Sequence, residues 1–216
     1  MKKLLVALGF ALAATGANAN IVSGGLTVIG ETPTAIVPSD AGWGGNGSTL
    51  DESLYTSGYA GTLTANTAGF FEATYLGQVA SFPNQYASNG MSFYGNNVPL
   101  PNYTSPGSSL GGIGVSAGET IAFNFIDGGD NSIFANGDIN KEFQGFIFLD
   151  AAVWNAIHET AYDFLIGYND SADVNSDYDD YVVGVVNHVP VPAALPLMAS
   201  ALGMFGVSRR KSKKAA

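Results

Sequence analysis

Four stretches of the chain alternate apolar and polar positions with a period of two, which is the pattern of a β-strand with one buried face. In the stretch that ends the body of the chain, Tyr181, Val183 and Val185 alternate with Val182, Gly184 and Val186, so we expect both of its faces to be buried. In the other three stretches one set of positions faces a core, namely Phe71, Ala73 and Tyr75; Ile121, Phe123 and Phe125; and Tyr162, Phe164, Ile166 and Tyr168.

Turn-forming Gly, Asn, Asp and Ser separate these short strands, and helix formers are sparse. This pattern predicts an all-β fold, an antiparallel β-sandwich that is jelly-roll-like. One helix is predicted over 150–161, with Asp150 as its N-cap and Val153, Ile157 and Ala161 on one face. The segments 42–48 and 81–112 are expected to be long loops.

The N-terminus has the layout of a secretion signal. Lys2 and Lys3 precede an apolar run from Leu4 to Ala14, and Ala17 and Ala19 form a small-x-small cleavage site. We therefore expect a signal helix in residues 1–19, removed by signal peptidase, and an exported domain that spans residues 20–187.

The C-terminus, residues 188–216, has a complementary layout. Val189, Pro190, Val191, Pro192 and Ala193 lead into a mostly apolar run that ends at Val207. A basic cluster follows, which includes Arg209, Arg210 and Lys211. The run is expected to form a transmembrane helix, and basic flanks stay cytoplasmic, so the body of the chain would lie outside the inner membrane.

This tail resembles the PEP-CTERM sorting domain of Gram-negative bacteria, although Val191 stands where the usual motif has Glu between its prolines. The resemblance implies that an exosortase recognises the tail and cleaves near 189–193, delivering the protein to the cell surface or the extracellular matrix. The alternative is a permanent single-pass anchor.

Charge is divided sharply along the chain. All eighteen acidic residues lie between Glu31 and Asp180, where Lys141 is the one basic residue, so the exported region carries a formal charge of −17. Such a field repels nucleic acid and attracts divalent cations, so no nucleic-acid partner is expected. The chain has no cysteine, which excludes disulfides and zinc–thiolate sites.

The densest polar cluster lies between the last two predicted strands. Six of its residues are candidate metal ligands, namely Asp170, Asp173, Asn175, Asp177, Asp179 and Asp180. Calcium takes 6–8 oxygen ligands in flexible geometry, and no Lys or Arg is close in sequence to offset these carboxylates. The cluster therefore predicts a structural calcium site; a solvated acidic loop is the alternative.

The same segment, Gly167 to Asp180, resembles a C-terminal element of secreted bacterial sandwich proteins in which an acidic run joins two strands. A second set of polar residues, from Asp127 to Asn140, is explained equally well as a second metal loop or as turn chemistry.

No motif for catalysis is present: His158-Glu159 lacks the second His of a zinc-protease helix, and no Gly-x-Ser-x-Gly elbow occurs. We expect Trp154 to be a core residue, and leave open whether Trp43 is one. The expected function is that of a non-enzymatic, calcium-stabilised surface or matrix protein associated with exopolysaccharide. A secreted polysaccharide-active enzyme and an anchored carbohydrate-binding protein are the alternatives.

Overall fold

The structure, a computed structural model, describes residues 20–36, 55–80, 82–95, 104–141, 144–170 and 177–190, together with Met198 and Ser200. The predicted signal at 1–19, the loop at 42–48, the basic part of the tail and its apolar part apart from Met198 and Ser200 lie outside the described residues. Among those that are described, no helix is long and apolar enough to cross a membrane.

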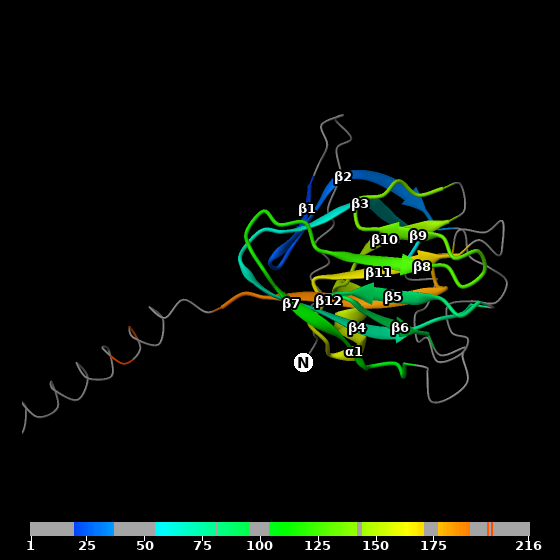
Figure 1. The fold of residues 1–216 in the computed structure, drawn as a ribbon. Coiled ribbons are helices and arrows are strands. Elements are labelled where there is room, and N and C mark those ends of the chain that lie inside the picture. The colour runs from blue at the N-terminus through cyan, green and yellow to red at the C-terminus, as the bar shows by residue number, and fades with distance from the viewer. Residues whose placement is uncertain are drawn as a thin grey trace, which may run out of the picture.

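Two antiparallel sheets form the body of the protein (Figure 1), which confirms the all-β prediction; the closer likeness to a jelly roll stays a prediction. The large sheet has the strand order β1-β2-β3-β10-β11-β12-β4-β7. Its strands are β1 (Ile21–Ser23), β2 (Leu26–Ala35), β3 (Ser57–Ala65), β10 (Gly145–Asp150), β11 (Phe164–Asn169), β12 (Tyr181–His188), β4 (Gly69–Gly77) and β7 (Ser109–Val115). The small sheet has the order β6-β5-β8-β9, with β6 (Met91–Tyr94), β5 (Gln85–Ser88), β8 (Phe123–Ile126) and β9 (Ile133–Ala135).

The main core lies between the two sheets and is rich in aromatic rings. Phe125 of the small sheet stacks on Tyr168 of the large sheet, with ring centroids 4.9 Å apart. It also meets Tyr181 edge-on at 5.9 Å. Such ring pairs add to the free energy gained by burial alone, so they fix how the small sheet sits on the large one.

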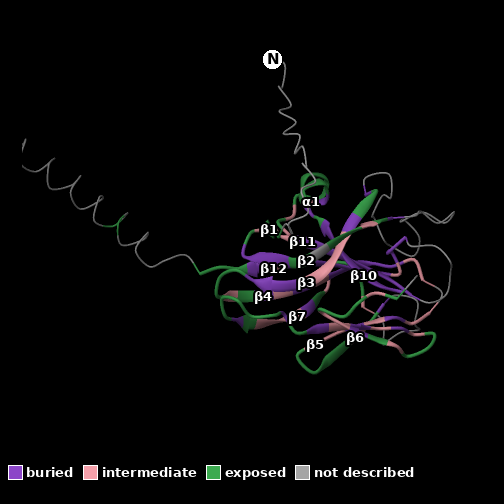
Figure 2. Cartoon of the chain, turned by 90° about the horizontal axis from the view of Figure 1, so that it is seen from above, coloured by how far each residue is buried: buried purple, intermediate pink, exposed green. Residues whose placement is uncertain are grey.

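A second, smaller core covers the opposite face of the large sheet. Ile147, Leu149, Leu165 and Val182 point to it from β10, β11 and β12, while their sequence neighbours point to the main core. Figure 2 shows the resulting band of buried residues along the central strands, with α1 (Ala152–His158) on one side and β5 and β6 on the other. The expectation that β12 is buried on both faces is therefore confirmed.

Two strand predictions are corrected. The segment from 162 to 168 was expected to bury one face, but β11 is buried at every position because both cores cover it. The segment 81–112 was expected to be a loop, and it contains β5, β6 and the start of β7. The sequence pattern did not predict these strands, because β5 and β6 are four residues long and expose polar side chains on one face.

The predicted helix exists, but it is shorter than expected and buries a different face. Ala151, not Asp150, is its N-cap, although the Asp150 carboxylate accepts a 2.8 Å hydrogen bond from the Ala152 N–H. Val153 and Ile157 are exposed, and Trp154 is the helix residue buried in the second core. The large indole buries more apolar area than either aliphatic chain, and this decides the face. Trp154 is thus a core residue, as predicted.

Candidate functional site

The acidic segment connects two adjacent strands of the large sheet, and its described residues are buried except for Asp180, which is partly buried. Tyr168 near the end of β11 pairs with Tyr181 at the start of β12, so the acidic segment leaves and re-enters the large sheet at the same end of these two strands. Asp170 and Asp177 are 2% and 4% exposed and Asp179 is fully buried. A solvated acidic loop would expose these carboxylates, so the burial contradicts that alternative for the described members.

Asp179 is the most unusual of these residues. Neither of its carboxylate oxygens accepts a hydrogen bond from an N–H or hydroxyl group of another described residue, and its polar side-chain neighbour is the Asp177 carboxyl. Burial, together with the nearby charges of Asp177 and Asp180, raises the pKa of Asp179 to about 9. An isolated buried carboxylate is costly unless a proton or a cation neutralises it.

Asp180 lies in a similar environment and is tied to Asp170. Burial, followed by the charge of Asp170, raises the pKa of Asp180 to about 9. One Asp180 oxygen accepts a 2.7 Å hydrogen bond from the Asp170 N–H, which partly offsets the shift. The two ends of the acidic segment are therefore joined directly.

Asn84, which comes just before β5, links the acidic segment to the small sheet. Its side-chain amide donates to the Asp170 carboxylate at 2.9 Å, and its amide oxygen accepts from the Gly128 N–H at 2.9 Å. Asn84 is fully buried. It therefore bridges the β11–β12 segment and the turn that follows β8.

Asp127 stands at the start of that turn and is fully buried. One of its oxygens accepts from the Gly129 and Asp130 N–H groups, at 2.6 Å and 3.2 Å. The other accepts a 2.6 Å bond from the Gln144 amide and a 3.4 Å bond from the Tyr168 hydroxyl. The charges of Asp127, Asp170 and Asp180, added to burial, raise the pKa of Tyr168. The two acidic sets that the sequence kept apart thus meet around Tyr168.

The rest of the second set forms turns. Asp130 accepts hydrogen bonds from the N–H and hydroxyl of Ser132, and Asp138 accepts one from the Ala135 N–H. The Asn140 amide donates to the Phe146 carbonyl and accepts from the Phe146 N–H. Turn chemistry accounts for most contacts of these residues, and Asp130 also accepts a 3.5 Å hydrogen bond from the Gln144 amide.

The basic residues of the described segments do not neutralise Asp179. Lys141 donates to the Ser132 hydroxyl at 3.0 Å and lies over the Phe134 ring. Between described residues, one ion pair occurs, joining His188 and Glu72 at 3.1 Å. The charge at Asp179 therefore depends on a proton or on a bound cation.

Glycine at position 167 lets the acidic segment lie against β11. A Cβ built on Gly167 would come within 2.5 Å of the Tyr178 carbonyl oxygen and 3.1 Å of its Cβ. Tyr178 has a left-handed backbone, with φ of 57°, and its ring is buried in the second core. The position of the acidic segment is thus coupled to the packing on the far face of the large sheet.

We expect Gly167→Ala to destabilise the protein by about 1–3 kcal/mol, because the new methyl group pushes the Tyr178 backbone away from β11. Chemical denaturation of the full chain measures this free energy of unfolding. Gly114→Ala is the matched control, since no heavy atom lies within 4 Å of a Cβ built there. Equal effects of the two substitutions would contradict the proposed close approach.

Of the six predicted ligands, the structure describes Asp170, Asp177, Asp179 and Asp180; Asp173 and Asn175 lie outside the described residues. In the described segments no three His, Asp or Glu side chains stand together as a complete metal-binding group.

The sequence pattern did not indicate Asn84, Gln144 or Gln78. The Gln78 amide is fully buried, without a hydrogen-bond partner in the described part of the chain, and packs on Gly95. An amide directly after a strongly alternating strand was the one available signal for Gln78.

The C-terminal sorting motif is described at its first two residues. Val189 and Pro190 follow β12 directly and are exposed, and 191–193 lie outside the described residues, as do Arg209, Arg210 and Lys211. No protein-family model, curated protein or solved structure matches this chain. The function proposed below therefore depends on the chemistry of these residues and on the sequence motifs.

Proposed function

We propose that this chain is an exported, non-enzymatic bacterial surface or matrix protein whose sandwich is stabilised by calcium. The fully buried Asp179 carboxylate, which accepts no hydrogen bond from an N–H or hydroxyl group of another described residue, is the observation that carries the calcium site. Calcium would be held by Asp179 and Asp180, with Asp170, Asp173, Asn175 and Asp177 as further ligands.

The choice of calcium follows from the donor atoms. The candidate ligands supply carboxylate and amide oxygens only. Such donors suit hard cations such as calcium and magnesium better than they suit zinc or copper. Magnesium needs a nearly ideal octahedron and keeps several of its waters. Calcium accepts irregular shells, which suits ligands spread over one irregular segment and completed by groups from neighbouring turns.

Export and surface sorting are proposed from the two termini. The signal at 1–19 and the PEP-CTERM-like tail at 188–216 support processing by signal peptidase and an exosortase, with transient passage through the inner membrane of a Gram-negative bacterium. The strong negative charge of the exported region supports a partner that is not a nucleic acid, and exopolysaccharide is the proposed partner.

Isothermal titration of calcium into the full chain tests the metal site. We expect saturable binding to the unchanged protein, and loss of that binding in the Asp177→Ala/Asp180→Ala variant because the oxygen ligands are gone. The Glu72→Gln/Glu159→Gln variant, in which two acidic residues outside the site lose the same charge, is expected to bind calcium like the unchanged protein. Equal weakening in both variants would mean that calcium responds only to net charge, and the site would be rejected.

A further inference from the structure

A hollow on the outer face of the small sheet has a composition unlike the rest of this acidic domain. It encloses about 550 Å³, within the roughly 300–1,000 Å³ typical of ligand pockets. None of the residues that line it is Asp, Glu, Lys, Arg or His. In a region with a formal charge of −17, an uncharged surface of this size needs a reason.

The hollow follows from strand register. Cross-strand partners point to the same face of a sheet, and the pairs Ser92–Ala87, Ala87–Asn124 and Asn124–Ala135 form one row across all four strands. The small side chains of Ala87 and Ala135 flank Asn124 on the two neighbouring strands, so the surface of the sheet is recessed along this row. The alternate residues, among them Tyr86, Phe125 and Phe134, point inward and fill the main core.

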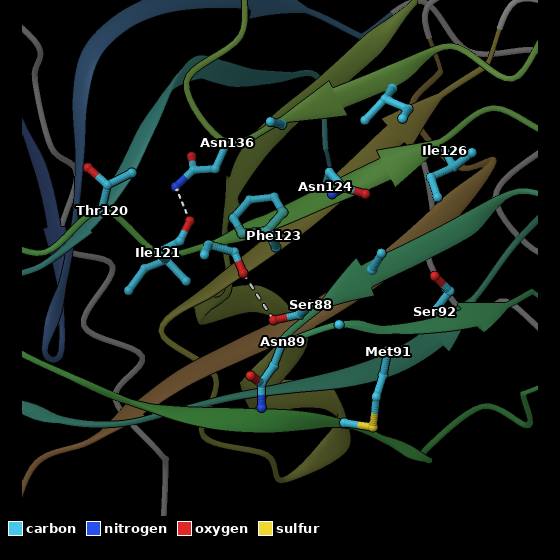
Figure 3. Close-up of a pocket in the computed structure, with 15 residues that line it drawn as sticks. Ser88, Asn89, Met91, Ser92, Thr120, Ile121, Phe123, Asn124, Ile126 and Asn136 are labelled. Carbon is cyan, nitrogen blue, oxygen red and sulfur yellow. Dashed lines mark hydrogen bonds between the residues drawn. The ribbon is translucent and has the colours of Figure 1, made fainter.

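The next outward row contributes Ile126 and Ile133 to the lining. It pairs Tyr94 with Gln85, Gln85 with Ile126, and Ile126 with Ile133. Ile133 is 61% exposed and Tyr94 is 37% exposed. Figure 3 shows the hollow, with Thr120 toward one end, Ile126 toward the other, and Asn124 on β8 between them.

Hydrogen-bonding groups are present but neutral. The lining includes the hydroxyls of Ser88, Ser92 and Thr120 and the amides of Asn89 and Asn124. The Asn124 side-chain oxygen is inaccessible to solvent and has no hydrogen-bond partner among the described residues. Asn124 therefore has hydrogen-bonding capacity that the described residues do not use, and its side chain lines the hollow.

We propose that this hollow binds a neutral polysaccharide chain. Sugar hydroxyls form hydrogen bonds with the part of the Asn124 amide that faces the hollow and with the serine hydroxyls, and the carbon faces of the rings pack on Met91, Ile126 and Ile133. Anionic chains are repelled by the surrounding charge, and cationic ones would find no acid in the lining. This inference rests on the polysaccharide partner of the proposed function and assigns it a site and a class.

Affinity electrophoresis of the full chain in native gels without added calcium tests the site. The gels contain a neutral galactomannan, a neutral dextran or anionic alginate. We expect at least one neutral polymer to retard the unchanged protein and alginate not to retard it. Asn124→Ala should raise the Kd for that polymer about 3- to 10-fold, the worth of one hydrogen bond. Ala135→Glu, which places bulk and charge in the hollow, should raise it more than about tenfold.

Ala156→Glu, on the exposed side of α1, is the matched control for Ala135→Glu and should bind like the unchanged protein. Urea denaturation of each variant shows whether the sandwich is intact. Retardation that neither Asn124→Ala nor Ala135→Glu changes would mean that the polysaccharide binds outside the hollow, and it would overturn the site. Retardation by alginate alone would overturn the neutral class, and no retardation by any polymer would overturn both the site and the polysaccharide partner. The calcium proposal stands or falls separately in all of these outcomes.

Discussion

Saturating calcium is expected to raise the melting temperature of the full chain by about 5–10 °C. A ligand at a hundred times its Kd adds about 2.7 kcal/mol to the stability of the folded state. For a domain of 150–250 residues, each kcal/mol shifts the melting temperature by about 2–4 °C. Scanning calorimetry with calcium, with magnesium and with a chelator measures the shift, and magnesium should give a smaller one.

The variant Asp179→Asn/Asp180→Asn makes this prediction more specific, because the amides keep the shape of the side chains and remove their charge. In chelator we expect it to melt above the unchanged protein, since two carboxylates that are costly to ionise are gone. Calcium should then have little effect. The Glu72→Gln/Glu159→Gln variant should keep the full calcium shift. A calcium shift of normal size in the Asn variant would show that the ion binds elsewhere.

The metal-free protein is expected to lose stability as the pH rises from 6 to 9. Asp179 and Asp180 have a pKa of about 9 when folded, against an ordinary value of 3.8. In this range the folded state therefore holds protons that the unfolded chain has released, so unfolding becomes easier as the pH rises. The slope is at most about 1.4 kcal/mol per pH unit for each proton held.

Calcium should remove this dependence, because the bound cation stabilises the ionised carboxylates in place of the protons. Urea denaturation at pH 6, 7, 8 and 9, with chelator and with calcium, gives both profiles. The exposed carboxylates are ionised in both states over this range, and they contribute little to the slope. The Asn variant should give a flat profile without metal. A flat profile for the unchanged metal-free protein would mean that these carboxylates are ionised without a cation.

The positions of the central strands could be predicted from the sequence, because burial on one or two faces leaves a strong local pattern of apolar residues. Phe71, Ala73 and Tyr75 and the fully apolar β12 show it clearly. β5 and β6 were missed because four residues with a polar outer face carry almost no pattern. The face of α1 was predicted wrongly because a helix of seven residues has too few positions to define a stripe, and the second core selected Trp154.

For the candidate site, the sequence by itself identified the acidic segment, because its ligand types lie within twelve consecutive residues. It also determined the separation of charge between termini and body, which is a property of composition. Only the tertiary structure brought Asn84 and Asp127 to that segment, from positions 86 and 43 residues before Asp170. The physical reason is strand order: β5 and β8 pair in the small sheet, and aromatic packing between sheets then sets their ends beside β11 and β12. Burial of Asp179 is likewise decided by that packing, since a local sequence specifies a carboxylate but not the dielectric around it.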